Sequence, residues 1–401
     1  MEYRIDQRTG NKISILGFGC MRLPGTLGRI NMEKTENLFL EAVKNGVNYF
    51  DTAYIYNGSE AAVGEILAKN GLRDRVYIAT KLPILQCHEY SDFERLFQIQ
   101  LERLQTDYID YYFMHALSGT AQWKALCNLG IEQWIEEKKA TGEIRQLGFS
   151  YHGSRDEFTE LLEEYDWDFC QIQYNYTNIN YQAGRDGLKR AHEKGLPVFI
   201  MEPLLGGRLA VGLPKQAEAL LKREDQSASF ASWAFRWLWD QPEVTMVLSG
   251  MNEPMQLQDN IETAGHSTAG MLTGREADTI DRVIEIFNAS YKIACTGCNY
   301  CMPCPKGINI PACFSAYNAS YSISRFTGIH QYMMSTGGMS TNPHTASDCV
   351  GCGQCEKHCP QQIPIRRSLK EVSKRMEPLW YRAGISIMAK NHTGHKDKKG
   401  Q

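Results

Sequence analysis

The sequence has no long apolar run and little net charge. No stretch approaches the roughly 18 to 20 apolar residues needed to cross a bilayer, and residues 1–8 contain no apolar signal core. The formal net charge is only −3, which gives the surface as a whole no electrostatic reason to bind nucleic acid or an anionic membrane. We therefore expect a cytoplasmic protein that binds neither nucleic acid nor membranes. Either partner would need a local patch of positive charge.

Cysteine is scarce in the first 290 residues and dense after them. Of the 13 cysteines, nine fall between Cys295 and Cys359. A chain of 401 residues that we expect not to be exported does not need a disulfide framework. The distribution instead predicts regions with different chemistry: a first domain over residues 1–290, a second over 291–385, and a polar, basic and disordered tail over 386–401.

The first region alternates short β-type runs with amphipathic helical stretches. Strands are expected at residues 16–20, 49–52, 76–81, 109–115, 146–150, 168–173, 198–202 and 245–250. Helices are expected near residues 33–46, 59–70, 91–105, 122–141, 154–165, 183–195, 216–240, 254–264 and 274–292. Strict alternation requires parallel strands, and eight units in about 250 residues predict an α/β fold with a closed (β/α)8 barrel.

Local signals refine these boundaries. Three serines are expected as helix N-caps, and four glycines follow helices where a left-handed C-cap would lie: Ser59, Ser91 and Ser154, and Gly46, Gly71, Gly142 and Gly195. The segment 3–15, with a Thr-Gly-Asn turn, is expected to form a hairpin before the barrel.

Polar residues stand at the carboxyl ends of three predicted strands. Asp51 and Lys81 follow apolar runs, Tyr56 lies in the loop after Asp51, and His115 closes another strand. Reactive groups of such barrels gather at this end, because the βα loops form the mouth there. A lone strand-end lysine or histidine is more often a hydrogen-bonded structural group, so the prediction depends on the four together.

The four residue types suit carbonyl reduction. A tyrosine hydroxyl has a pKa of about 10, so it keeps a proton that it can give to a developing alkoxide. A neighbouring lysine ammonium would lower that pKa, and a carboxylate would hold the lysine charged. Histidine can donate a second hydrogen bond to the oxyanion. This chemistry needs a hydride source and no metal.

These residues match a known family. The segment 50–56 (Phe-Asp-Thr-Ala-Tyr-Ile-Tyr), Ser59-Glu60, Ala79-Thr80-Lys81 and His115 resembles the Asp, Tyr, Lys and His tetrad of the aldo-keto reductases. Segments 17–23 and 148–150 resemble the family's first and fifth strands. The resemblance covers about residues 1–290. It implies a nicotinamide cofactor across the barrel mouth, a small carbonyl or alcohol substrate, and Tyr56 as the general acid.

The resemblance also implies the residues that hold the cofactor. Ser150 and Gln171 would contact the carboxamide, and the segment 205–208, with Gly206 and Arg208, would wrap the pyrophosphate. Ser249, Gly250 and Asn260 would lie along the adenosine half.

The chain departs from the family pattern at several positions. Tyr151 stands where the family usually has Asn, and Met201 stands where an aromatic ring usually stacks on the nicotinamide. Gly250 and Gln256 replace the basic residues that bind the 2′-phosphate of NADPH, and Glu253 would repel that phosphate. We therefore expect NADH to be preferred over NADPH.

The second region carries two cysteine runs that each end in Cys-Pro. They are Cys349-x2-Cys352-x2-Cys355-x3-Cys359-Pro360 and Cys295-x2-Cys298-x2-Cys301-x2-Cys304-Pro305. The first has the spacing by which ferredoxins hold a 4Fe-4S cluster, and its fourth cysteine serves another cluster when two are present. Zinc is the alternative, although zinc sites pair two such gaps rather than chaining three cysteines.

The runs resemble a two-cluster ferredoxin, and their long separation favours the α-helical type. That resemblance implies that Cys295, Cys298, Cys301 and Cys359 hold one 4Fe-4S cluster. Cys304, Cys349, Cys352 and Cys355 would hold the other, and Cys313 would not be a ligand.

The two regions present a chemical difficulty together. A cluster carries one electron and a nicotinamide carries a hydride, while the sequence has no flavin fingerprint that would supply a converter. We expect catalysis in the barrel, with clusters that are structural or that relay electrons to a redox protein partner. The alternative is an iron-sulfur electron-transfer protein whose barrel serves mainly for docking. The intact tetrad argues against that alternative.

Overall fold

The computed structural model describes residues 1–26, 28–322, 324–336 and 344–381. The chain forms two compact units. The first contains Met1–Leu204 and Ala228–Gly274, and the second contains Leu205–Ser227 and the chain from Arg275 onward. The tail expected to be disordered, residues 386–401, lies outside the described residues.

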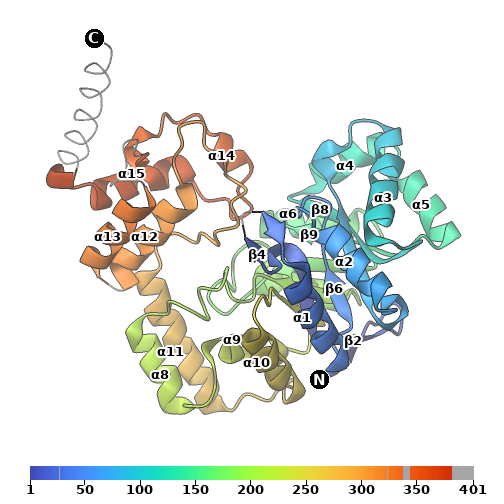
Figure 1. The fold of residues 1–401 in the computed structure, drawn as a ribbon, viewed down its shortest axis with the longest axis horizontal. Coiled ribbons are helices and arrows are strands. Elements are labelled where there is room, and N and C mark those ends of the chain that lie inside the picture. Colours follow the sequence, from blue (N-terminus) through green and yellow to red (C-terminus); the bar gives the residue numbers. More distant parts are fainter. Residues whose placement is uncertain (27, 323, 337–343, 382–401) are drawn as a thin grey trace, which may run out of the picture. The chain divides into compact units, whose positions relative to one another are not determined.

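The first unit is a closed barrel of eight parallel strands, which confirms the predicted (β/α)8 fold (Figure 1). Its last strand pairs with its first, with Val247 opposite Leu16, and this pairing closes the barrel. In chain order the strands are β3 (Leu16–Gly19), β6 (Tyr49–Asp51), β7 (Tyr77–Leu82), β8 (Ile109–Leu117), β9 (Ile144–Tyr151), β10 (Phe169–Gln173), β11 (Val198–Met201) and β12 (Met246–Ser249).

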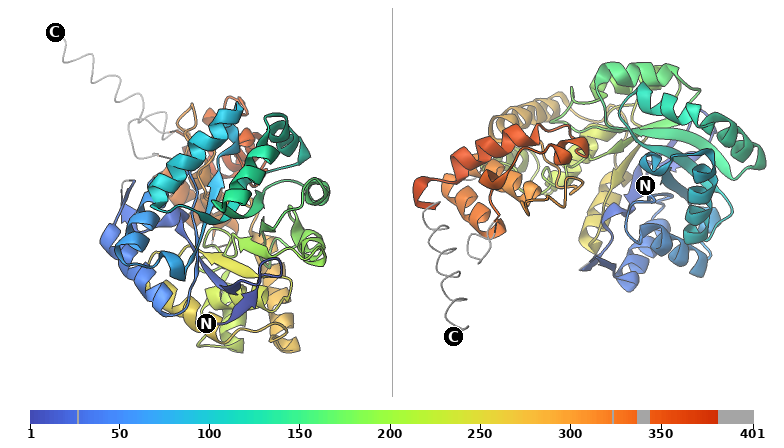
Figure 2. Two further views of the ribbon diagram at one scale, coloured as in Figure 1. Left: turned by 90° about the vertical axis from the view of Figure 1, so that its right-hand side faces the viewer. Right: turned by 90° about the horizontal axis from the view of Figure 1, so that it is seen from above.

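Helices cover the outside of these strands (Figure 2). They are α1 (Met32–Lys44), α2 (Ser59–Lys69), α3 (Tyr90–Leu104), α4 (Thr120–Asn128), α5 (Ile131–Thr141), α6 (Arg155–Glu163), α7 (Gly184–Glu193), α9 (Phe230–Trp239) and α10 (Pro254–Gly265). Short 3-10 turns occur at Cys20–Arg22, Arg73–Arg75 and Ile84–Gln86, and a small hairpin joins β4 (Gly25–Thr26) to β5 (Arg29–Ile30).

Two predictions of long helices were wrong. The stretch expected at 122–141 is broken between α4 and α5, where Gly130 has a φ of 90° that a helix cannot continue through. The stretch expected at 216–240 is also two helices. Its second half begins at Ser229, whose hydroxyl accepts a hydrogen bond from the N–H of Ser232.

The predicted helix ends were partly right. Ser154 is the N-cap of α6, and the four expected glycines all have positive φ. The other two serines are not caps. Gly58 precedes Ser59 as the N-cap of α2, and α3 begins after a capping box formed by Glu89 and Asp92 rather than at Ser91.

The barrel interior is filled by aromatic rings. Tyr111 lies 5.2 Å from Tyr49, 5.1 Å from Phe169 and 5.5 Å from Phe199, measured between ring centroids. Its hydroxyl donates a hydrogen bond to Asp6 over 2.8 Å. Asp6 follows the first strand of the expected hairpin, which consists of β1 (Tyr3–Ile5) and β2 (Lys12–Ser14). The interior is therefore a packed core, which leaves the strand ends and loops at the mouth as the place for chemistry.

The second unit is mainly helical, as predicted. Its helices are α8 (Lys215–Glu224), α11 (Gly274–Ser290), α12 (Ile310–Ser322), α13 (Arg325–Ser335), α14 (Gln354–Lys357) and α15 (Ile365–Met376), with a 3-10 turn at Ala346–Asp348. Apolar residues of α12 and α15 form one buried cluster, and seven of the cysteines contact this cluster or belong to it. Within the described residues, no helix is both long enough and apolar enough to cross a membrane.

Candidate active site and cysteine clusters

Asp51 and Lys81 form a buried ion pair at the end of two adjacent strands. The Nζ of Lys81 lies 2.5 Å from Oδ1 of Asp51 and donates a second hydrogen bond, over 2.8 Å, to the carbonyl of Thr52. The side chain of Lys81 is 1% exposed, and that of Asp51 is 6% exposed. Strand pairing of β6 with β7 fixes the distance between their backbones. The partner carboxylate therefore keeps a charged ammonium in a site with almost no water.

Tyr56 lies close to both Lys81 and His115. The ring centroid of Tyr56 is 5.2 Å from Nζ of Lys81 and 6.0 Å from the ring centroid of His115, with the two rings nearly perpendicular. A tight turn holds Tyr56, since its N–H bonds to the carbonyl of Ala53 and its carbonyl accepts from the N–H of Ser59. The four predicted residues are thus brought together by three strands and one loop.

His115 is held in its neutral form. Burial, and next the positive charge of Lys81, lower the pKa of His115 well below its usual value. A neutral imidazole still carries one ring N–H, which it can donate to an oxygen that gains negative charge. The register of β8 against β9 shifts between Met114 and Leu117, as at a bulge. Bulges of this kind change the direction of side chains next to active sites, and His115 lies within this irregular stretch.

A buried hydrogen-bond network supports the site from behind. Glu60 is 2% exposed and accepts bonds from Thr80 (2.6 Å) and Gln100 (2.7 Å), and it pairs with Arg103 (3.0 Å). Gln100 also donates to the carbonyl of Lys81, over 3.1 Å. Arg103 reaches the carbonyl of Tyr54 over 3.4 Å, two residues before Tyr56.

No role could be predicted from the sequence for Gln100 or Arg103. Their spacing of three residues on α3 could have placed them on one face of the helix, but nothing in the sequence pointed to Glu60 as their shared partner. We call Glu60, Thr80, Gln100 and Arg103 the support network.

The residues expected to hold a nicotinamide occupy several strand ends of the barrel unit. The hydroxyl of Ser150 accepts a bond from the N–H of Ala116 over 2.8 Å, and Asn260 donates to the hydroxyl of Ser249 over 2.9 Å. Met201 is half-buried at the end of β11, and Gly250 follows β12. Gln171 donates to Oδ2 of Asp51 over 3.1 Å. Asp51 is therefore held from two sides, a contact that sequence analysis did not expect.

Gly206 and Arg208 belong to the second unit. The guanidinium of Arg208 donates to the hydroxyl of Ser315 over 2.6 Å. Gly206 has a φ of 64°, and a Cβ at this position would lie only 2.1 Å from the carbonyl oxygen of Thr296. The segment after β11 therefore packs against the residue that follows Cys295. Their predicted contact with a pyrophosphate remains a prediction.

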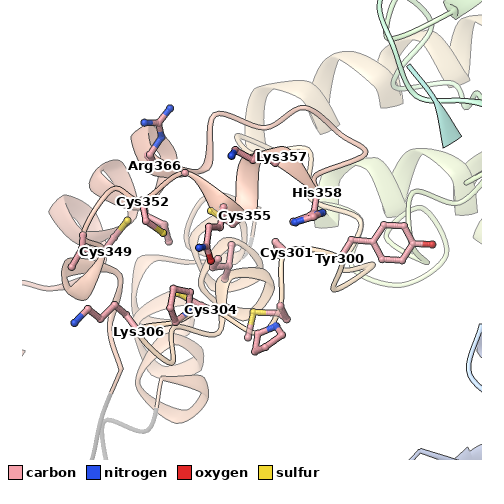
Figure 3. A pocket seen from close by; sticks show the side chains of 18 residues that line it. Tyr300, Cys301, Cys304, Lys306, Cys349, Cys352, Cys355, Lys357, His358 and Arg366 are labelled. Atoms are coloured by element: carbon pink, nitrogen blue, oxygen red, sulfur yellow. The ribbon is translucent and has the colours of Figure 1, made fainter. Parts of the chain in front are cut away.

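The cysteines gather around two cavities of the second unit. Cys295, Cys298, Cys301 and Cys359 line a small cavity. Cys304, Cys349, Cys352 and Cys355 line another of about 360 Å³, which Cys301 also borders (Figure 3). Each set thus combines cysteines from both runs. The described residues contain no group of three or more His, Cys, Asp or Glu side chains arranged to hold a single metal ion.

Local contacts hold the first run in place. Tyr291 donates to the carbonyl of Cys295 over 2.8 Å, and the buried Asn318 bonds both the N–H and the carbonyl of Ile293. Burial raises the pKa of Cys295 to about 11 and that of Cys301 to about 12. Such thiols stay protonated in the absence of a cation, so a metal group that binds them must displace their protons. Cys313 is fully buried in the apolar core, apart from both sets.

A model of the aldo/keto reductase family matches residues 15–285, and a model of a 4Fe-4S dicluster domain matches residues 294–363. The chain belongs to the aldo-keto reductase family. It is an NAD(P)H-dependent oxidoreductase by that membership, and it carries an added 4Fe-4S domain. Both parts of the resemblance stated from the sequence are confirmed.

Individual relatives agree with this assignment. The chain is 28% identical over 304 residues to the uncharacterized oxidoreductase YrpG of Bacillus subtilis, covering 65% of this chain and 90% of that protein. The holo form of aldo-keto reductase AKR11C1 from Bacillus halodurans has a TM-score of 0.59 at 26% identity, covering 71% of this chain and 96% of the other. An aldo-keto reductase from Klebsiella pneumoniae in complex with NADPH has a TM-score of 0.58 at 22% identity, covering 71% and 95%.

Proposed function

We propose that this aldo-keto reductase reduces an aldehyde or ketone to an alcohol, with Tyr56 as the general acid. The observation that carries the proposal is the position of the Tyr56 ring, 5.2 Å from the buried ammonium of Lys81 and 6.0 Å from His115. The bound nicotinamide would supply the hydride. The residues at the strand ends suit this cofactor, because the amide of Gln171 and the hydroxyl of Ser150 can both donate and accept hydrogen bonds.

Each residue of the tetrad has a defined task in this proposal. Tyr56 gives its hydroxyl proton to the substrate oxygen as that oxygen becomes an alkoxide. Lys81 favours the phenolate that remains, and Asp51 keeps Lys81 charged and in position. His115 donates its ring N–H to the same oxygen and fixes the direction of the carbonyl.

The test compares two tyrosines of the same loop. Tyr56→Phe removes only the transferable proton, so turnover should fall roughly 10²- to 10⁴-fold. Tyr54→Phe is the matched control. The phenylalanine keeps the ring over which Arg103 lies, so this variant should retain activity. Oxidation of the reduced nicotinamide is followed for a panel of carbonyl substrates. Full turnover by Tyr56→Phe on a substrate that the wild type reduces would exclude the mechanism.

NADH is the nucleotide that we propose for this chain. Gly250 has no side chain with which to bind a 2′-phosphate, and the Gln256 side chain already accepts a bond from the N–H of Asn252 over 3.0 Å. Glu253 is exposed at the start of α10. The structure of the Klebsiella pneumoniae relative contains NADPH, so a direct titration with both nucleotides is the measurement that decides this point.

We further propose two 4Fe-4S clusters with exchanged fourth ligands. Cys295, Cys298, Cys301 and Cys359 would hold one, and Cys304, Cys349, Cys352 and Cys355 would hold the other. The lining of the two cavities supports this division, and thiolates are the ligands that such clusters use. All 13 cysteines are free of disulfides, which supports a reducing, cytoplasmic location.

Iron analysis of anaerobically prepared protein tests this assignment. About eight iron and eight sulfide per chain are expected for two four-iron clusters. Cys359→Ser should damage the cluster of the distant Cys295 run and spare the other. Cys127→Ser, on the barrel helix α4, is the control and should leave iron content unchanged. Stoichiometric zinc without iron would replace the cluster assignment by the zinc alternative.

A further inference from the structure

The cysteine-rich region carries a charge opposite to that of the whole chain. Residues 293–376 contain eight Lys or Arg and three Asp or Glu, a formal charge of +5, whereas the full chain has −3. A charge asymmetry of this kind indicates that the cysteine-rich region, rather than the whole surface, interacts with a negatively charged partner.

Part of this charge surrounds the larger cysteine cavity. Lys306, Lys357 and Arg366 come from three separate segments and line the cavity that also contains Cys349, Cys352, Cys355 and Cys304. Figure 3 shows these three basic side chains at different sides of the cavity. We call them the basic rim. Lys306 lies two residues after Cys304, Lys357 ends α14, and Arg366 lies in the first turn of α15.

The rim offers charge that no described side chain neutralises fully. Lys306 and Lys357 are exposed, and neither forms an ion pair with another side chain in the described part of the chain. Arg366 pairs with Glu356 over 2.7 Å, but its side chain is still 52% exposed. The partial desolvation of an exposed lysine costs little free energy, so these lysines can form ion pairs with carboxylates of a partner protein.

Two residues that line the larger cysteine cavity are exposed to solvent. Cys352 is exposed, and the neighbouring Val350 is 63% exposed. The cysteines of the other set are each half-buried. A cluster held by Cys352 would therefore have an edge that another protein can approach. The apolar Val350 would give such a contact a small dry centre inside the charged rim.

We propose that the basic rim docks a small acidic one-electron carrier protein of the flavodoxin or ferredoxin class. The inference rests on the two-cluster assignment of the proposed function. The exchange moves one electron and no atom: the reduced carrier loses one electron and the cluster gains it, or the reverse. Complementary charge raises the rate of encounter, and a small interface allows the carrier to leave again.

The basic residues have another physical use that the experiment must separate. A cluster bound by four thiolates is negatively charged, so nearby lysines could serve only to offset that charge and tune its potential. Both uses predict lysines near the cavity. Only docking predicts that reversing a rim charge weakens carrier binding while iron content and visible spectrum stay unchanged.

The experiment uses the full-length, iron-loaded protein and an acidic flavodoxin as the probe. Binding is measured by calorimetry at low ionic strength, and electron transfer by stopped-flow absorbance. Lys306→Glu and Lys357→Glu should each weaken binding roughly tenfold, and added salt should weaken wild-type binding. The control is Lys215→Glu, which should bind as the wild type does, because Lys215 is exposed and does not line the cavity. It begins α8, a helix that Figure 1 shows well apart from α14.

Each outcome decides between the proposals. Iron-loaded wild type that does not bind flavodoxin, or rim variants that bind as tightly as wild type, would overturn docking and leave the proposed reductase activity unaffected. Tighter binding of duplex DNA or of anionic vesicles than of flavodoxin would overturn it as well. Wild type without iron would overturn the cluster assignment itself. If a reversal variant loses iron, Lys306→Met and Lys357→Met replace it, with an expected loss of about threefold.

Discussion

The guanidinium of Arg208 donates a hydrogen bond to the hydroxyl of Ser315, 107 residues further along the chain. Two residues earlier, the backbone at Gly206 lies so close to the carbonyl of Thr296 that a side chain has no space there. Both contacts lie within the second unit. The segment after strand β11 is therefore packed directly onto the loop that begins the first cysteine run.

Gly206→Ala should disturb the first cysteine set. The added Cβ would lie 2.1 Å from the Thr296 oxygen, so the loop or the segment must move, at a cost of about 1 to 3 kcal/mol. Gly207→Ala is the matched control, since Gly207 also has a positive φ but no atom within 4 Å of the new Cβ. The measurement is the rate at which a chelator removes iron. Equal rates for the two variants would show that the contact does not support the cluster loop.

The protein should lose stability as the pH falls below about 6.5. Burial lowers the pKa of His152 to about 4, and His115 shifts in the same direction. The unfolded chain then binds protons that the folded chain excludes. The stabilising contribution is complete above pH 6.5 and decreases toward pH 4, and for His152 the loss between pH 7 and pH 5 is about 2 kcal/mol.

Denaturant unfolding at the two pH values measures this loss. His152→Gln should reduce the difference, whereas His88→Gln, at an exposed position, should leave it unchanged. A pH dependence that is identical in wild type and His152→Gln would contradict the assignment of the effect to this imidazole.

Glu60→Gln should lower turnover although Glu60 lies in the support network and is not proposed to contact the substrate. The change removes the charge partner of Arg103 and one acceptor of the support network, which costs about 1 to 3 kcal/mol of stability. Because this network holds the carbonyls of Lys81 and Tyr54, we expect kcat to fall about tenfold while KM changes little. Glu65→Gln, on the exposed face of α2, is the control. An unchanged kcat in Glu60→Gln would limit the network to a purely structural role.

Gln256→Arg should tighten NADPH binding. A charge-assisted hydrogen bond to the 2′-phosphate contributes roughly 1.5 to 3 kcal/mol, so the dissociation constant should fall at least tenfold. Gln258→Arg places the same charge two residues later on α10 and should have a smaller effect. Both are measured by direct titration. Wild-type protein that already binds NADPH more tightly than NADH would refute the preference predicted from Gly250 and Gln256.

The barrel could be predicted from the sequence because each strand is short, apolar and followed by a helix of regular period. The tetrad followed from the same rule, since the end of each strand is also the mouth of the barrel. The break at Gly130 was missed because a single glycine inside a helical period is usually tolerated. The true cap of α3 was missed because Glu89 and Asp92 form a reciprocal pair that a search for a capping serine overlooks.

Long-range partners could not be predicted in the same way. The bond from Gln171 to Asp51 joins residues 120 positions apart, and their pairing depends on which side chains the closed barrel turns inward. The packing of Gly206 on Thr296 likewise depends on tertiary structure, so a boundary drawn from composition could not show that residues 205–227 fold with the cysteine-rich unit.

This membership has a consequence for any attempt to separate the two units by cutting the chain once. Leu205–Ser227 leaves the barrel and returns to it before α9, so a fragment that ends at Gly274 would keep this segment and lose the unit with which it packs. Five of its apolar residues are buried in the whole chain: Leu205, Leu209, Leu213, Ala217 and Leu221. Part of that surface would become exposed and promote aggregation. One cut after Gly274 therefore divides the core of the second unit rather than a linker.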